Sequence, residues 1–116
     1  MDTIFTAERR HNRRYDLRLP LHYCVSQKGG LALSGSGLTC DMSTSGLSFR
    51  CRKPLPPGAH IEIVIDWPAR FGELYPIDLQ VTGFVTRSHG GRTAVRVTSR
   101  KFRVDALAAE PYQASA

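Results

Sequence analysis

Two clusters of polar residues in this chain have the types and spacing needed to bind a ligand. The first, at residues 9–14, reads Arg-Arg-His-Asn-Arg-Arg. The second, at residues 41–46, reads Asp-Met-Ser-Thr-Ser-Gly and combines a carboxylate, hydroxyls and a glycine. Such a segment presents donors and acceptors instead of filling a core. Together the two clusters predict a ligand that is both guanine-like and phosphorylated.

The arginine cluster contains two pairs at helical spacing, Arg9 with Arg13 and Arg10 with Arg14. A guanidinium group binds two phosphate oxygens at once, or the O6/N7 edge of guanine. It also stacks on the face of a purine. The alternative is a solvated basic tail without a specific ligand, since Arg-x-x-x-Arg is common in basic chains.

The second cluster can read a guanine base. The ionised carboxylate of Asp41 accepts two hydrogen bonds side by side, and guanine offers N1–H and N2–H₂ as adjacent donors, which adenine does not. Ser43 can donate to the ligand or cap the backbone of its own turn. Gly46 permits a positive φ and a close approach of the ligand to the backbone. The alternative is an ordinary side-chain-stabilised turn that binds nothing.

The segments around these clusters alternate between apolar and polar residues with a period of two, which is typical of β-strands. We expect strands at residues 17–25, 31–40, 47–51, 61–67, 77–85 and 93–98. A hairpin turn at Ser88–Gly91 joins the last two, and Pro68–Pro76 is expected to be a loop. Gly83, in phase with the apolar residues, marks a bulge or a barrel corner. Six strands without a convincing helix between them predict an all-β barrel or sandwich, and closing the barrel removes exposed edges.

The length of 116 residues favours one domain. We divide it into a flexible arginine-rich arm (1–16), a six-stranded antiparallel β-barrel (17–103) and a C-terminal tail (104–116). Within the tail, residues 106–109 are expected to form a short helical turn before Pro111. The arm is expected to carry part of the ligand site.

Composition limits the class of protein. The apolar fraction of 41% is enough for a core, and the net charge of +6 favours anionic partners. The three cysteines contain no Cys-x-x-Cys pair, which indicates reduced, mostly buried thiols. The N-terminus is too short and polar for a signal peptide, and no apolar run is long enough to span a membrane. We therefore expect a cytoplasmic protein.

The order and flanks of the motifs identify a family resemblance. The arginine cluster leads into Arg-Tyr-Asp-Leu-Arg-Leu-Pro-Leu (14–21), and Asp-x-Ser-x-x-Gly follows and enters a strand at Leu47. This pattern, over residues 8–103, resembles the PilZ domain, a bacterial β-barrel that binds cyclic di-GMP. The family signature, Arg-x-x-x-Arg then Asp/Asn-x-Ser-x-x-Gly, is intact at Arg10/Arg14 and at Asp41, Ser43 and Gly46.

The resemblance also assigns a role to Arg9, which precedes the motif. In the family, this position influences whether one cyclic di-GMP molecule or an intercalated pair is bound. An arginine here favours the pair, because it stacks and adds charge against the phosphates. His11 departs from the arginine or aromatic residue often found nearby in the family.

The resemblance implies a receptor for cyclic di-GMP and not an enzyme. No nucleophile or metal-ligand spacing surrounds the histidines, and no cofactor is expected. The arm is expected to close over the ligand, and its movement to signal to an unidentified protein partner. Two alternatives stay open: a PilZ-fold interaction module with weak or no nucleotide binding, and a basic nucleic-acid-binding barrel. Against the latter, Phe49 and Trp67 share the phase of the core residues, so nucleic acid is not the expected partner.

Overall fold

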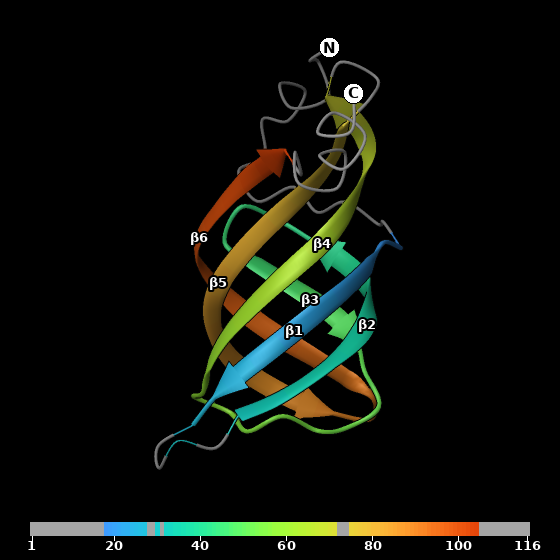
Figure 1. The fold of residues 1–116 in the computed structure, drawn as a ribbon. Helices are drawn as coiled ribbons and strands as arrows, with labels where there is room; N and C mark the ends of the chain where they lie inside the picture. Colours follow the sequence, from blue (N-terminus) through green and yellow to red (C-terminus); the bar gives the residue numbers. More distant parts are fainter. Residues whose placement is uncertain (1–17, 28–29, 31, 72–74, 105–116) are drawn as a thin grey trace.

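The computed structural model describes residues 18–27, 30, 32–71 and 75–104, and these residues form six antiparallel strands. The strands close into a barrel in the order β1-β2-β3-β6-β5-β4 (Figure 1). Their bounds are β1 Pro20–Ser26, β2 Ala32–Met42, β3 Gly46–Arg50, β4 His60–Phe71, β5 Tyr75–His89 and β6 Arg92–Val104. The predicted all-β, six-stranded antiparallel barrel is confirmed.

The barrel interior is filled by the apolar phase of each alternating strand. In β1, for example, every second residue is buried, so that Leu21, Tyr23 and Val25 point inward while their neighbours are exposed. Phe49 is fully buried, and its ring lies 5.6 Å from that of Tyr23. The other main core side chains come from β3, β4, β5 and β6: Leu47, Ile61, Ile63, Ile65, Leu79, Val81, Val85 and Val95. Burial of this set is the main stabilising contribution to the barrel.

Glycines allow two close approaches between neighbouring strands. A Cβ atom at Gly37 would overlap the carbonyl oxygen of Arg50, and one at Gly83 would overlap that of Arg96. The β5–β6 register shifts between Thr82 and Gly83, as expected for a bulge or corner at this glycine. These positions let the sheet bend tightly enough to close.

The structure corrects several expected boundaries. Pro68–Pro76 is not simply a loop, because β4 continues to Phe71 and β5 begins at Tyr75. Pro68 lies where the β4–β5 register shifts between Trp67 and Arg70, so the irregular pairing accommodates it. Strand β6 also continues beyond Arg100 to Val104, and β1 begins at Pro20 instead of Leu17.

The prediction that Phe49 and Trp67 lie in the core holds fully for the first and only partly for the second. Phe49 is fully buried, whereas Trp67 is only partly buried and packs edge-on against the exposed ring of Phe102, with centroids 5.1 Å apart. The predicted arm (1–16) and the helical turn at 106–109 lie outside the described residues. Within the described part of the chain, no helix is long and apolar enough to cross a membrane.

Candidate ligand-binding site

A cleft of about 570 Å³ lies on the barrel wall between the β2–β3 connection and the β5–β6 hairpin. One side is formed by Asp41, Ser43 and Gly46, three residues of the predicted site. The other side carries Arg87, His89 and Arg92. Ser48 and Ala94 lie between the two sides, together with Leu47 and Val95.

Strand register explains why these distant residues meet. Asp41 pairs with Ser48, Ser48 with Ala94, and Ala94 with Arg87, so one row of residues crosses β2, β3, β6 and β5. In the adjacent row, Arg50 pairs with Arg92 and Arg92 with His89. With neighbouring strands about 4.8 Å apart, Asp41 and Arg87 are separated by roughly 14 Å along the row. Small side chains occupy the centre of this row, and charged ones occupy its ends.

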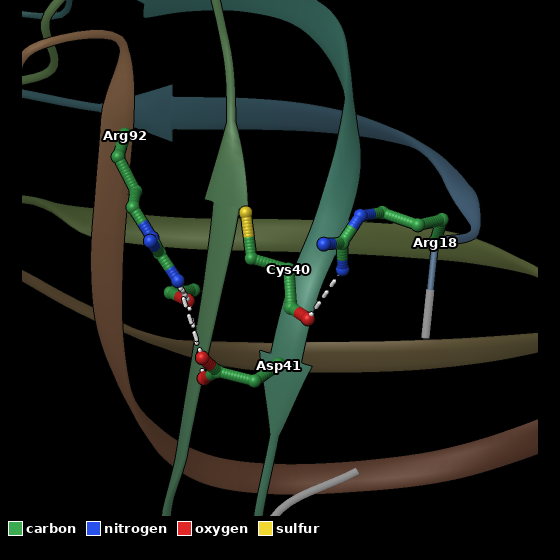
Figure 2. A network of polar contacts seen from close by, with 5 residues as sticks. Arg18, Cys40, Asp41 and Arg92 are labelled. Carbon is green, nitrogen blue, oxygen red and sulfur yellow. Dashed lines mark hydrogen bonds and ion pairs between the residues drawn. The ribbon is translucent and has the colours of Figure 1, made fainter. Parts of the chain in front are cut away.

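The carboxylate of Asp41 is held by two side chains from neighbouring strands. Ser48 Oγ donates to Asp41 Oδ1 at 3.2 Å, and Arg92 Nη2 donates to Oδ2 at 3.2 Å. The same Arg92 nitrogen lies 3.4 Å from Ser48 Oγ. Figure 2 shows Arg92 reaching to the Asp41 carboxylate. Because each carboxylate oxygen can accept two hydrogen bonds, these contacts orient the group and leave acceptor capacity for a ligand.

The turn between β2 and β3 is stabilised by its own backbone and by Ser43. The amide of Ser43 donates to the Gly46 carbonyl at 2.8 Å, and the amide of Gly46 donates to Ser43 Oγ at 3.1 Å. Arg100 Nη1 donates to the Thr44 carbonyl at 2.6 Å and braces the tip. Ser43 therefore caps its own turn, one of the two roles predicted for it.

Gly46 does not have the positive φ that the sequence suggested, because the described glycines with positive φ are Gly30, Gly58, Gly90 and Gly91. Gly46 instead lies in β3 in extended pairing with Arg96. A Cβ atom there would lie 3.4 Å from the Val95 carbonyl, an ordinary contact. Packing within the described residues therefore does not require glycine at this position.

The β5–β6 hairpin is fixed from behind by a buried polar network. Ser88 Oγ lies 2.7 Å from Thr93 Oγ1, and Thr93 Oγ1 lies 3.3 Å from Cys51 Sγ. The amide of Leu55 donates to Ser88 Oγ at 2.9 Å. The hairpin predicted at Ser88–Gly91 is present, and its turn consists of Gly90 and Gly91 alone, whose positive φ values allow so tight a connection. The cationic side of the cleft is therefore carried by an anchored element.

The chain enters β1 beside the site. Leu19 and Thr39 exchange two hydrogen bonds: the Leu19 amide donates to Thr39 Oγ1 at 2.8 Å, and the Thr39 amide donates to the Leu19 carbonyl at 2.9 Å. Arg18 Nη1 donates to the Cys40 carbonyl at 2.9 Å, next to Asp41 (Figure 2).

The structure thus brings Asp41, Ser43 and Gly46 into one cleft, whereas Arg9, Arg10 and Arg14 lie outside the described residues. Sequence reasoning did not identify Ser48, Arg87, His89 and Arg92 as site residues. The sequence did contain a hint of Arg87, His89 and Arg92. These three basic residues flank the Gly90-Gly91 turn and are exposed. Only long-range strand pairing places them opposite Asp41.

Comparison with known proteins identifies the family. The profile of the PilZ domain matches residues 8–107. This chain belongs to the PilZ domain family. A similar solved structure is the crystal structure of the PilZ domain of CeSA from a cellulose-synthesising bacterium, with a TM-score of 0.56 and 19% identity, covering 75% of this chain and 81% of that chain. No curated protein sequence matches this one significantly.

PilZ domains are binding and regulatory modules, and they generally bind cyclic di-GMP. In this PilZ domain the cleft brings together a carboxylate, hydroxyls and guanidinium groups. Among the described residues, no group of three or more His, Cys, Asp and Glu side chains is placed to hold a metal ion. The arrangement can accept hydrogen bonds from a base and donate them to phosphate oxygens.

Proposed function

We propose that this protein is a receptor for cyclic di-GMP that acts by binding and not by catalysis. The observation that carries the proposal is the cleft lined by all three fixed residues of Asp-x-Ser-x-x-Gly, in a chain of the PilZ family. Asp41 accepts from the N1–H and N2–H₂ donors of a guanine base. Ser43 shapes the turn beside it, and Gly46 lets the ligand approach the backbone.

The arm completes the site in this proposal. Arg10 and Arg14 bind guanine and phosphate from above the cleft, and Arg9 favours an intercalated pair of ligand molecules. The position of Arg18 and Leu19 beside Thr39 and Cys40 supports this role, because these residues follow the arm in the sequence and lie next to Asp41. Phosphate contacts by the arginines make the affinity decrease with ionic strength.

Calorimetric titration of cyclic di-GMP into the wild type, Arg10→Ala and Asp41→Ala tests the binding proposal, with GTP and cyclic di-AMP as competitors. We expect saturable binding by the wild type, its loss in both variants, and no competition by the adenine dinucleotide. Lys101→Ala, which removes one exposed positive charge from β6, is the control and should bind as the wild type does. A wild type that binds nothing at low salt contradicts the proposal.

Signalling in this proposal depends on a change in arm position that a protein partner detects. The arm offers trypsin four sites, after Arg9, Arg10, Arg13 and Arg14. We expect saturating cyclic di-GMP to slow cleavage at these sites, because guanidinium groups bound to the ligand are withheld from the protease. Asp41→Ala should show no protection at the same ligand concentration. Equal cleavage rates for the wild type with and without ligand would contradict the arm's role.

A further inference from the structure

The β5–β6 hairpin presents two arginines and a histidine to the cleft, and the family signature does not include them. Arg87 and His89 on β5 and Arg92 on β6 all line the cleft, and none of the residues from Arg87 to Arg92 is acidic. A concave site lined by two arginines and a single carboxylate favours an anionic group of the ligand.

The two arginines differ in the contacts that their side chains already make. Arg92 is engaged with Asp41 and Ser48. The side chain of Arg87, in contrast, forms no hydrogen bond or ion pair with any residue of the described segments, and Arg87 is exposed. A guanidinium group that faces a cleft without a partner among the described residues has its donors available for a ligand.

The position of Arg87 complements that of Asp41. The two residues end the same cross-strand row, and only Ser48 and Ala94 separate them. These small side chains leave room over the centre of the row for a flat base. A ligand whose base is held at Asp41 has room to extend a phosphate towards the hairpin.

We propose that Arg87 is a phosphate-binding residue that holds the ligand from the side of the cleft opposite Asp41. This inference rests on the proposed function, and it adds a second, rigid source of phosphate contacts to those of the arm. The buried network of Ser88 and Thr93 fixes the backbone next to Arg87, so its Cα is already in place before the ligand arrives. Arg87 thereby contributes affinity without an ordering cost for the backbone.

The test is calorimetric titration of cyclic di-GMP into the wild type, Arg87→Ala, Arg87→Lys and Arg52→Ala at low and high ionic strength. Arg52 is exposed and carries the same charge but does not line the cleft. We expect Arg87→Ala to weaken binding at least about tenfold, as for loss of a charged hydrogen bond. Arg87→Lys should retain part of the affinity, because it keeps the charge but not the fork of donors. Arg52→Ala should change it by less than about twofold.

The comparison of ionic strengths distinguishes a direct contact between Arg87 and the phosphate from non-specific attraction by the positive charge of the protein. Arg87→Ala should show a weaker salt dependence than the wild type, and unchanged urea unfolding should show that the barrel is intact. If the wild type binds and Arg87→Ala and Arg52→Ala have equal effects, the inference is overturned while the receptor proposal stands. If the wild type does not bind, both are overturned.

Discussion

Arg92 Nη2 lies 3.2 Å from Asp41 Oδ2, so a cation of the hairpin already holds the carboxylate that is proposed to read guanine. The side chain of Arg92 is 55% exposed and that of Asp41 28% exposed. An ion pair this accessible to water contributes little to folding, since solvent screens it and two side chains lose freedom. Its role is to orient the Asp41 carboxylate.

A double-mutant cycle measures this interaction. We expect Arg92→Ala, Asp41→Ala and the double variant to give a coupling free energy of about 0.2–1 kcal/mol in urea unfolding. The coupling should decrease in high salt, because screening weakens exposed pairs. A coupling that is several times larger and independent of salt would contradict this description of the pair as an orienting surface contact.

Alanine substitutions at Gly46 and Gly37 should have different effects: the first should weaken ligand binding, and the second should lower stability. A methyl group at Gly46 meets only ordinary contacts, so Gly46→Ala should unfold nearly as the wild type does but bind cyclic di-GMP more weakly. A methyl group at Gly37 would overlap the Arg50 carbonyl, so Gly37→Ala should lower the free energy of unfolding by about 1–3 kcal/mol or more. Urea unfolding and calorimetry on both variants check this, and equal effects on stability would contradict it.

Tyr23 makes stability depend on alkaline pH. Burial, with a contribution from Cys51, raises the pKa of Tyr23 above its ordinary value of 10.0. The folded barrel therefore holds the phenolic proton more tightly than the unfolded chain does. Its contribution to stability is complete below pH 10.0 and is lost as pH rises from there through the higher folded pKa.

Tyr23→Phe is the matched variant for this effect, because it keeps the ring that packs against Phe49 and removes the titrating hydroxyl. The difference in unfolding free energy between wild type and variant should be constant at neutral pH. Above pH 10.0 it should shift in favour of the variant. Urea unfolding over a pH series measures it, and two parallel curves across the alkaline range would refute the assignment.

Period-two alternation was enough to predict the six strands, because side chains that alternate between core and solvent leave that pattern in the sequence. The pattern alone left a barrel and a sandwich open, and the removal of exposed edges and the family resemblance favoured the barrel. The ends of the strands were harder to predict. Pro68 and Pro76 suggested a loop, yet both lie within strands, since an irregular β4–β5 register tolerates a residue that cannot donate a hydrogen bond.

The candidate site also contains residues that could be predicted from the sequence and residues that could not. Asp41, Ser43 and Gly46 are close together in the sequence, so a local motif was enough to predict them. Arg87 and Arg92 are more than forty residues away, and only the pairing of β3 with β6 and of β6 with β5 brings them to the same cleft. A single sequence does not contain that pairing in any local pattern, which is why the hairpin side of the cleft was missed.

The central claim is that cyclic di-GMP binds in the cleft between Asp41 at the end of β2 and the β5–β6 hairpin, and backbone amide chemical shifts test it most directly. Cyclic di-GMP would be titrated into isotope-labelled wild-type protein and the perturbed amides mapped. The account predicts perturbations at residues 43–48 and 87–94, with little change at 22–25 in β1 and 62–64 in β4, across the barrel. Perturbations centred on β1 and β4, or none at saturating ligand, would contradict it.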